Sequence, residues 1–298
     1  MCEHAHGEHG HTHETGLARN ARPDEFRVVL TGKGGVGKTS LTALLARLLA
    51  RRAYRVLALD ADPQMNLPYA LGLPQEQARA LVPLSHNQDY IEEKTGARPG
   101  SGWGLFFRLN PDVDDVVRRF GVVTPDKVRL LVMGDTVQPA AGCLCPENTL
   151  LAAVANNLSL RGNEIILLDT QAGVEHFGRA LARGFRHAVV ITDPSFNGVQ
   201  VALQSARLAD GLGIPMLHLV VNRVRNDREM DRVMQILHCE DHPAFATQHI
   251  LPWDERLLES EPDVGPLLGD AKSPLLASVT ELRDALLYEE SLQCLRAS

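Results

Sequence analysis

Eight residues near the start of the chain have a composition that suits phosphate binding. The segment Gly32–Thr39 reads GKGGVGKT and fits the pattern G-x-x-x-x-G-K-[ST]. Glycines let the backbone curl so that its N–H groups point at phosphate oxygens, and a following helix adds its positive end. Lys38 supplies charge to the β- and γ-phosphates, and the Thr39 hydroxyl is a ligand for Mg²⁺. The predicted nucleotide-binding residues here are Gly34, Gly35, Val36, Gly37, Lys38, Thr39 and Ser40.

Two acidic segments follow later apolar runs. The first is Asp60-Ala61-Asp62-Pro63, and the second begins with Asp169 and ends at Gly173. A carboxylate near a γ-phosphate can position the attacking water even with an ordinary pKa. Asp60 is either an auxiliary group behind the Mg²⁺ ligands or the cap of a strand, and both interpretations stay open. In this order after a phosphate loop, the two segments predict hydrolysis of a nucleotide.

A third group of residues could bind a transition metal. Cys143 and Cys145 stand one residue apart in a Gly-Cys-x-Cys-Pro turn. One such pair fills half of a tetrahedral site, which a two-fold dimer would complete as four thiolates around Zn²⁺ or an iron–sulfur cluster. Four thiolates could also form a square-planar Ni²⁺ site. The alternative is that both cysteines are small buried apolar residues.

The elements that must position these groups alternate between strands and helices. Apolar runs of strand length occur at 26–32, 55–60, 128–134, 163–170, 187–193 and 215–222. Leucines recur at helical spacing directly after the phosphate loop, and 149–158 and 197–212 are helical in pattern. A strand, a helix and a strand within about 35 residues form a βαβ unit. The pattern predicts an α/β fold with a doubly wound, mostly parallel sheet, whose chemistry lies in loops after the strands.

We expect a single domain over residues 25–298. The periodicity weakens between 64 and 127, which we interpret as an insertion on the active-site side of that domain. Residues 1–24 are polar, contain almost nothing to bury and predict a flexible tail.

Composition narrows the class of protein. With 44% hydrophobic residues among 298, the chain can bury a substantial core. The 30 basic against 37 acidic residues give a net charge of −7, which argues against nucleic acid as a partner. No apolar run approaches the roughly 20 residues that cross a bilayer, and the start of the chain lacks the apolar core of a signal peptide. Five cysteines form no disulfide framework, so we expect a cytoplasmic protein that does not bind membranes.

The loop GKGGVGKT resembles the deviant Walker A loop of the MinD/ParA/nitrogenase-iron-protein ATPases, in which the extra lysine, here Lys33, reaches the nucleotide of the partner subunit. The resemblance implies an ATP-hydrolysing homodimer that binds ATP or ADP with Mg²⁺. It also implies that Asp62 orients or deprotonates the attacking water, that Asp169 holds Mg²⁺ through water, and that the Gly173 N–H senses the γ-phosphate. Lys33 is otherwise an ordinary exposed loop lysine.

Similar positions in that superfamily hold adenine. Here they are Asn222-Arg223, after an apolar strand, and Pro252 in Leu251-Pro252-Trp253-Asp254. An asparagine amide can both donate to and accept from a purine edge. The alternative is a capped strand end.

The string CLCPEN, the helical stretch after it and DTQAGVEHFGR resemble the CooC family, ATPases that assist nickel insertion into carbon monoxide dehydrogenase. EEKTG at 92–96 and FRLNPDVDD at 107–115 are similar to that family too, and the likeness runs from about 26 to 261. It implies that Cys143 and Cys145 of each subunit form a Ni²⁺ or Zn²⁺ site at the dimer interface, and that the partner is apo carbon monoxide dehydrogenase. Glu175 and His176 either link the nucleotide to the metal region or cap the next helix, and the second interpretation is preferred.

The tail departs from that family and resembles the His-rich tails of nickel chaperones for hydrogenase and urease. Imidazole is a good ligand for Ni²⁺, Zn²⁺ and Cu²⁺, and several on one flexible tail give avidity without a fixed cage. An expression tag is the alternative to metal storage or scavenging. The candidate tail ligands are His4, His6, His9, His11 and His13.

The chain contains further cysteines, and its motifs also allow rival functions. In His238-Cys239-x-x-His242, helical geometry would place only the two histidines on one face, so we favour a structural role. Cys294 is interpreted as inert. The rival functions are an iron–sulfur redox ATPase like the nitrogenase iron protein and a ParA/MinD-type positioning ATPase. Against the first, that family uses well-separated cysteines; against the second, net charge disfavours DNA and residues 285–298 are too poor in basic side chains for a membrane anchor.

Overall fold

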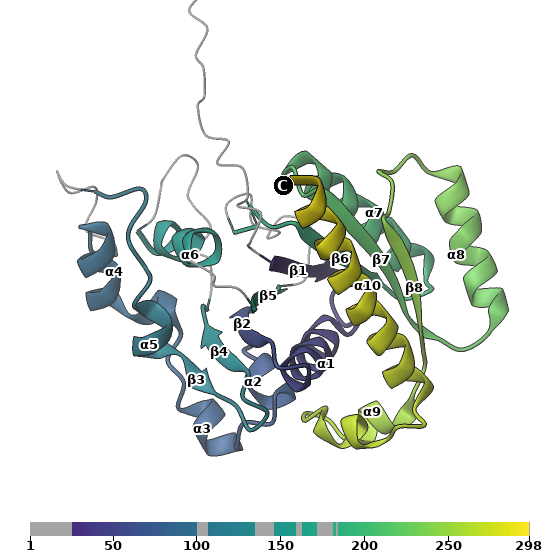
Figure 1. Ribbon diagram of the computed structural model, residues 1–298, viewed down its shortest axis with the longest axis horizontal. Helices are drawn as coiled ribbons and strands as arrows, with labels where there is room; N and C mark the ends of the chain where they lie inside the picture. Colours follow the sequence, from purple (N-terminus) through teal and green to yellow (C-terminus); the bar gives the residue numbers. More distant parts are fainter. Residues whose placement is uncertain are drawn as a thin grey trace, which may run out of the picture.

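A computed structural model describes residues 26–99, 107–134, 146–158, 163–171, 181–182 and 184–297, with side chains to Ser291. Its centre is an eight-stranded sheet in the order β3-β4-β2-β5-β1-β6-β7-β8 (Figure 1). All neighbouring strands are parallel except β3, which is antiparallel to β4. The predicted doubly wound α/β fold is therefore confirmed. The strands are β1 (Phe26–Gly32), β2 (Arg55–Ala61), β3 (Val122–Val123), β4 (Arg129–Val132), β5 (Glu164–Thr170), β6 (His187–Thr192), β7 (Met216–Val224) and β8 (Thr247–Pro252).

Helices cover both faces of the sheet. Helices α1 and α10 pack on one face, and α6 and α7 pack on the other. None of the helices in the described ranges is both long and apolar enough to cross a membrane. The α-helices are α1 (Lys38–Arg51), α2 (Leu67–Ala70), α3 (Gln75–Arg79), α4 (Gln88–Thr95), α5 (Val116–Phe120), α6 (Pro146–Asn157), α7 (Phe196–Gly211), α8 (Asp227–Cys239), α9 (Glu255–Glu259) and α10 (Pro274–Ala297), with 3₁₀ turns η1 (Leu84–His86) and η2 (Gly265–Gly269).

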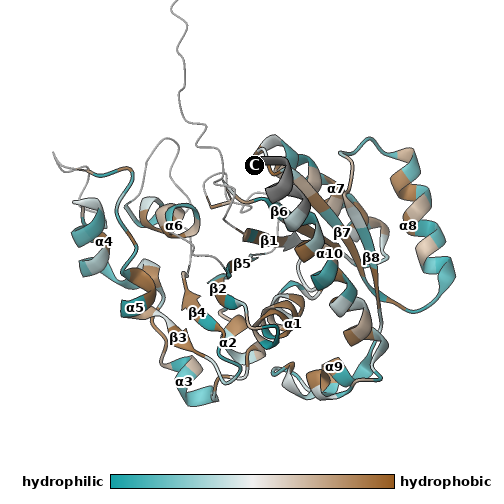
Figure 2. Cartoon of the chain, in the orientation of Figure 1, coloured by the Kyte–Doolittle hydropathy of each residue, from teal (hydrophilic) through white to brown (hydrophobic). Residues whose placement is uncertain are grey.

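Strand β1 shows why the sequence reads as continuous apolar runs. Val28 and Leu30 point to the α1 and α10 face, whereas Val29 points to the α6 and α7 face, and all three are fully buried. A parallel strand covered on both faces needs apolar residues at every position. Helix α1 is accordingly hydrophobic over most of its length, while the peripheral α8 carries both hydrophobic and hydrophilic residues (Figure 2).

The described residues of the segment 64–127 form α2, α3, η1, α4, α5 and β3, at the end of the sheet that β3 and β4 make (Figure 1). Within this segment, Tyr90 connects α4 to Asp115 and to Arg119 of α5. The Tyr90 hydroxyl donates to Asp115, 3.0 Å away, and the Arg119 guanidinium lies 4.6 Å from the centre of the Tyr90 ring. Burial raises the pKa of Asp115, but hydrogen bonds from Lys94, Tyr90 and Arg119 outweigh it and lower that pKa to about 2. The insertion is therefore held by these ion pairs as well as by buried apolar residues that pack in the core, among them Leu67, Leu71 and Ile91.

Arg27 of β1 is fully buried and holds the end of α6. Its guanidinium donates to the backbone carbonyl of Ala155, 2.6 Å away, and to that of Leu158. These carbonyls at the end of a helix have no partner within the helix, and a cation there also complements the helix dipole. Arg27 thereby ties α6 to the central strand of the sheet.

A chain of polar side chains links the amino ends of β6, β7 and β8 to α10. His187 Nε2 lies 2.9 Å from the Glu290 carboxylate, and its Nδ1 lies 3.0 Å from His218 Nε2. His218 Nδ1 lies 2.8 Å from the Thr247 hydroxyl, which is 3.0 Å from His249 Nε2. If each ring donates toward Glu290, every donor in this chain meets an acceptor while all three imidazoles stay neutral. These contacts hold α10 at the amino ends of the strands, opposite the loops that follow the carboxyl ends.

Candidate functional site

The phosphate loop joins the end of β1 to the start of α1. Lys38, the first residue of α1, is buried, and its Nζ donates to the backbone carbonyls of Gly32 and Lys33, each 3.1 Å away. Burial lowers the pKa of Lys38, and the charges of Asp169 and Asp62 act in the opposite direction. The ammonium group is thus held within the loop at the positive end of a 14-residue helix.

Two glycines allow this loop to approach the neighbouring strands. A Cβ on Gly32 would lie 2.1 Å from the Ile191 carbonyl oxygen, so β1 and β6 could not stay in register. Gly37 precedes α1 with φ of 96°, and a Cβ there would lie 2.6 Å from the Asn222 side-chain nitrogen. Glycine tolerates both the positive φ and the close contact. Glycine at positions 32 and 37 is therefore required by contacts with the neighbouring strands as well as by phosphate binding.

Asp60 and Asp169 are paired in the register of β2 and β5, beside the loop. Asp60 is fully buried and accepts hydrogen bonds from the N–H groups of Asp62, at 3.1 Å, and Leu67, at 3.3 Å. Burial, followed by the charge of Asp169, raises the pKa of Asp60 well above its usual range. Of the two interpretations left open for Asp60, these contacts favour the cap, because the side chain fixes the turn that carries Asp62.

Asp169 offers an oxygen suited to Mg²⁺. One carboxylate oxygen accepts from the Thr42 hydroxyl at 3.3 Å, while the other is buried and has no hydrogen-bond partner among the described residues. Burial raises the pKa of Asp169 to about 6, against hydrogen bonding from Thr39 and the charge of Lys38. An orphaned carboxylate oxygen beside the Thr39 hydroxyl fits a hard cation that prefers oxygen ligands. When bound there, Mg²⁺ would neutralise charge on the β- and γ-phosphates.

Asp62 lies in the turn after β2, at the same edge. Its carboxylate accepts from the N–H of Gln64 at 2.9 Å, and its backbone carbonyl accepts from the N–H of Met65. The side chain is partly exposed, so a carboxylate there remains accessible to water. The structure thus brings Lys38, Thr39, Asp62 and Asp169 to one edge of the sheet.

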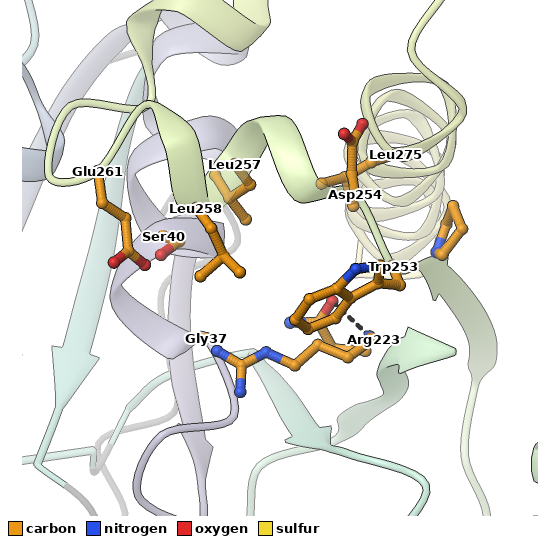
Figure 3. Close-up of a pocket in the computed structure, with 11 residues that line it drawn as sticks. Gly37, Ser40, Arg223, Trp253, Asp254, Leu257, Leu258, Glu261 and Leu275 are labelled. Carbon is orange, nitrogen blue, oxygen red and sulfur yellow. Dashed lines mark hydrogen bonds between the residues drawn. The ribbon is translucent and has the colours of Figure 1, made fainter. Parts of the chain in front are cut away.

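A small cavity of about 20 Å³ lies next to Gly37 and Ser40, on the β7 side of the loop, whereas Asp169 of β5 lies on the other side. Asn222, Arg223 and Pro252, which the resemblance assigned to the base, line it together with Trp253. Arg223 and Trp253 lie side by side in Figure 3. The pairing of β7 with β8 is irregular between Val221 and Val224, and Arg223 has a φ of 63°. Such a bulge can re-aim side chains, and here both Asn222 and Arg223 reach the cavity.

Several cavity residues were not foreseen. They are Leu257, Leu258, Glu261 and Leu275, which come from α9, the turn after it and the start of α10, where no motif marks them. Trp253 and Asp254 belong to the Leu251-Pro252-Trp253-Asp254 string noted in the sequence, and Arg225 stacks on the Trp253 ring at 4.3 Å.

Some predicted residues lie outside the described residues. These include both cysteines of the proposed metal pair, the predicted γ-phosphate sensor, the two residues after the second acidic segment and the tail histidines; the Cys294 side chain is also outside. By number they are Cys143, Cys145, Gly173, Glu175, His176, His4, His6, His9, His11 and His13.

The geometry assumed for the second cysteine cluster was wrong. Helix α8 ends at Cys239, so His242 lies beyond the helix and does not share a helical face with His238. The ring of His242 instead lies 5.3 Å from that of Phe245, and its Nδ1 is 2.8 Å from the Pro243 carbonyl. Among the described residues there is no cluster of three or more metal-ligating side chains. These contacts of His242 are local, so we keep the interpretation that residues 238–242 have a structural role.

Comparison with known proteins identifies relatives of the whole described fold. Residues 27–263 match the family model "CobQ/CobB/MinD/ParA nucleotide binding domain". The chain is 36% identical over 251 residues to the uncharacterized ATP-binding protein MJ0823 of Methanocaldococcus jannaschii, covering 83% of this chain and 93% of that protein. It is 32% identical over 262 residues to the carbon monoxide dehydrogenase accessory protein CooC of Rhodospirillum rubrum, covering 86% of this chain and 97% of that protein.

Solved structures agree on the fold. The MinD cell division protein of Aquifex aeolicus superposes with a TM-score of 0.60 at 20% identity, covering 88% of this chain and 96% of that one. The septum site-determining protein MinD of Pyrococcus horikoshii, complexed with Mg-ADP, gives a TM-score of 0.57 at 18% identity, covering 90% and 98%. The family match spans most of the chain and includes the loop and both acidic segments. The chain is therefore an ATP-binding P-loop ATPase of the CobQ/CobB/MinD/ParA family.

Proposed function

We propose that this ATPase handles nickel for the maturation of carbon monoxide dehydrogenase. The observation that carries the proposal is the similarity to CooC of Rhodospirillum rubrum, a carbon monoxide dehydrogenase accessory protein, over 97% of the length of that protein. The Cys143-Leu144-Cys145 pair adds a chemical reason, because thiolates are suitable ligands for Ni²⁺ and Zn²⁺. The protein would work in the cytoplasm, where thiols stay reduced.

The nucleotide would lie along the edge of the sheet where Asp60 and Asp169 meet. The loop amides and Lys38 bind the phosphates, Thr39 and Asp169 hold Mg²⁺, and Asp62 positions water. The support for these roles is the burial of Lys38 against the loop, the orphaned oxygen of Asp169 and the accessible carboxylate of Asp62.

The base would lie against Asn222, Arg223 and Pro252, where the small cavity between them would widen to hold it. Gly173 would contact the γ-phosphate. Lys33, which lies partly exposed at the loop, would reach the nucleotide of a second copy of the chain.

The place of the cysteines in the chain supports a link between nucleotide and metal. Val132, the last residue of β4, pairs in register with Asp60, which in turn pairs with Asp169. Strand β4 therefore ends at the nucleotide edge, and Cys143 and Cys145 lie in the sequence between this strand and α6, which starts at Pro146. Two subunits that share their nucleotide edges would each offer one cysteine pair to a common site.

The cycle follows from this arrangement. Two subunits bind Mg-ATP, close on each other and bring two cysteine pairs around one Ni²⁺ or Zn²⁺. ATP drives closure only by binding the closed state more tightly than the open state. Hydrolysis loosens the dimer and changes the metal site, so that nickel passes to apo carbon monoxide dehydrogenase. The cycle involves neither nucleic acid nor membrane.

An anaerobic Ni²⁺ titration tests the metal site. The chain lacking residues 1–22 is titrated with ADP present, following thiolate-to-nickel charge-transfer absorbance together with mass. We expect one nickel per dimer, lost in Cys143→Ser with Cys145→Ser. Cys239→Ser, which removes an exposed cysteine of α8, serves as the matched control and leaves binding unchanged.

Unchanged nickel binding after both cysteine substitutions would reject the site. An iron–sulfur spectrum in the protein as isolated would instead favour a redox ATPase. ATP-dependent binding to DNA or liposomes would favour a positioning ATPase. The ATPase assignment stands in each case, because it rests on the family and not on the cysteines.

The tail is tested separately. Five imidazoles within residues 1–24 would bind additional Ni²⁺ or Zn²⁺ weakly. We expect the full chain to bind more metal than the truncated chain, with the excess insensitive to Cys143→Ser and Cys145→Ser. Equal stoichiometry in the two chains would remove the tail from the proposal.

A further inference from the structure

Residues 254–265 cross the mouth of the cavity assigned to the base, and we call them the strap. They comprise Asp254, helix α9 and the turn that leads to Gly265. Leu257, Leu258 and Glu261 of the strap line the cavity (Figure 3). Helix α9 has no buried residue, and Leu258 is 46% exposed. The buried apolar contact of the strap is at Val264, near its second end, so α9 depends on how the two ends of the strap are held.

The first end is held at the start of α10. Asp254 accepts from the N–H of Arg256 at 3.1 Å and from the Ser273 hydroxyl at 3.0 Å. The Arg256 guanidinium contacts both Asp254 and Asp270. These contacts are local, since every partner lies within 20 residues of Asp254 along the chain.

The second end is held from a distance by Arg47 of α1. The Arg47 guanidinium is almost completely buried and donates to Asp263 at 2.5 Å. Asp263 also accepts from the N–H of Gly265 at 2.8 Å, and the N–H of Val264 donates to the Ala70 carbonyl. A Cβ on Gly265 would lie 2.5 Å from the guanidinium, so the strap backbone passes directly over it. The turn is thus held by the Arg47–Asp263 pair, by the Val264 N–H and by the burial of the Val264 side chain, which together leave it little freedom.

The same guanidinium binds a second carboxylate that is unrelated to the strap. Arg47 Nε donates to Asp126, in the turn between β3 and β4. Asp126 does not line the cavity. Asp263 and Asp126 therefore pair with one buried cation, but only Asp263 belongs to the strap.

We propose that Arg47, acting through Asp263, is a positioning residue that holds the strap over the nucleotide base and so sets nucleotide affinity. Arg47 lies in α1 and does not line the cavity, so it acts only through the backbone that it fixes. This inference rests on the assignment of the cavity to the base. When Asp263 no longer holds the turn, the nucleotide must order the strap as it binds, which costs affinity.

The test compares Asp263→Asn with Asp126→Asn in chains that also carry Trp103→Phe. Trp253 is then the only tryptophan, because the sequence has two. ADP binding is followed by Trp253 emission, and ATP hydrolysis gives kcat and KM. We expect Asp263→Asn to raise Kd for ADP and KM for ATP about tenfold, with kcat within about twofold, because the phosphate site is untouched. Asp126→Asn should leave Kd and KM unchanged while lowering Tm by a similar amount.

Three outcomes would overturn the inference. If Asp263→Asn binds ADP as tightly as the parent, the strap does not need Arg47. If both variants weaken binding in proportion to their loss of Tm, the ion pairs only stabilise the fold. If ADP leaves Trp253 emission unchanged in the parent, the base is not in this cavity, and the base assignment fails together with the inference.

Discussion

The side-chain nitrogen of Asn222 donates a hydrogen bond to the backbone carbonyl of Val36, 2.7 Å away. Asn222 lies near the end of β7 and lines the cavity, whereas Val36 belongs to the phosphate loop. The Asn222 oxygen accepts from the N–H of Arg223 at 2.9 Å. One amide group thus connects the loop to the cavity next to it, and one N–H and one lone pair remain for a ligand.

Loss of that amide should weaken nucleotide binding. Asn222→Ala leaves the Val36 carbonyl without its donor and removes the remaining amide contact to a base. A loss of about 1–3 kcal/mol corresponds to roughly a 5- to 150-fold rise in Kd for ADP, measured by calorimetry. Asn226→Ala is the matched control, since Asn226 caps α8 instead. Equal affinities of Asn222→Ala and the parent would show that the link is dispensable.

Asp169 should be needed for hydrolysis more than for nucleotide binding. Asp169→Asn replaces the orphaned carboxylate oxygen with a neutral group, so Mg²⁺ loses its charged partner in the protein. We expect kcat to fall at least ~100-fold, because metal charge stabilises the transition state by several kcal/mol. Binding of ADP without Mg²⁺ should change little. Near-parental Mg²⁺-dependent turnover of the variant would contradict the assignment.

The two loop lysines should differ in what they do. Lys38→Ala should abolish nucleotide binding, because Lys38 lies buried within its own loop. Lys33→Ala should bind ADP normally yet hydrolyse ATP roughly 100-fold more slowly, since a cation supplied by a partner acts on the transition state. Mixing Lys33→Ala with a chain inactivated by Asp169→Asn tests this by measuring ATPase activity. No recovery of activity at any mixing ratio, together with a monomeric mass in ATP, would argue against a shared site.

The buried histidine chain predicts a stability that falls with acid. Burial, followed by the charges of His187 and His249, lowers the pKa of His218 to about 3. Below the ordinary histidine pKa of about 6.5, the unfolded chain therefore binds a proton that the folded chain refuses. Stability is complete above pH 6.5 and falls by up to ~1.4 kcal/mol per pH unit as the pH decreases toward 3.

The measurement is urea denaturation of the parent and His218→Gln between pH 7.5 and 4.5. Glutamine can still hydrogen-bond but does not titrate in this range. We expect the variant to be less stable at pH 7.5 and to lose less stability on acidification. Parallel curves for the two proteins would show that His218 is not the titrating group.

The residues of the candidate nucleotide site could be singled out because they are local in sequence. The phosphate loop lies within eight residues, Gly32–Thr39, and Asp60 and Asp169 each stand near the end of an apolar strand. A parallel sheet then brings the ends of neighbouring strands to one edge, so the order of motifs predicts their meeting.

The features that the sequence did not predict depend on contacts between residues far apart in the chain, and such contacts leave no local pattern. Arg27 reads as one polar residue in an apolar strand, and only its contact with carbonyls more than 120 residues away explains its burial. Arg47 likewise reads as part of an amphipathic helix, although it pairs with Asp126 and Asp263. Strand β8 alternates exposure along an edge and was not predicted, and the Pro252–Trp253 step at its end was recognised only by resemblance.

Helix α10 bears on how the protein can be attached to a surface or a dye. Leu275, at its start, lines the cavity, whereas Glu290, fifteen residues later, contacts His187 at the opposite edge of the sheet. A label or immobilisation handle placed after Glu290 therefore emerges on the side of the molecule that faces away from the phosphate loop. Single-molecule recordings of association between copies can use that position without obstructing the edge through which two copies would meet.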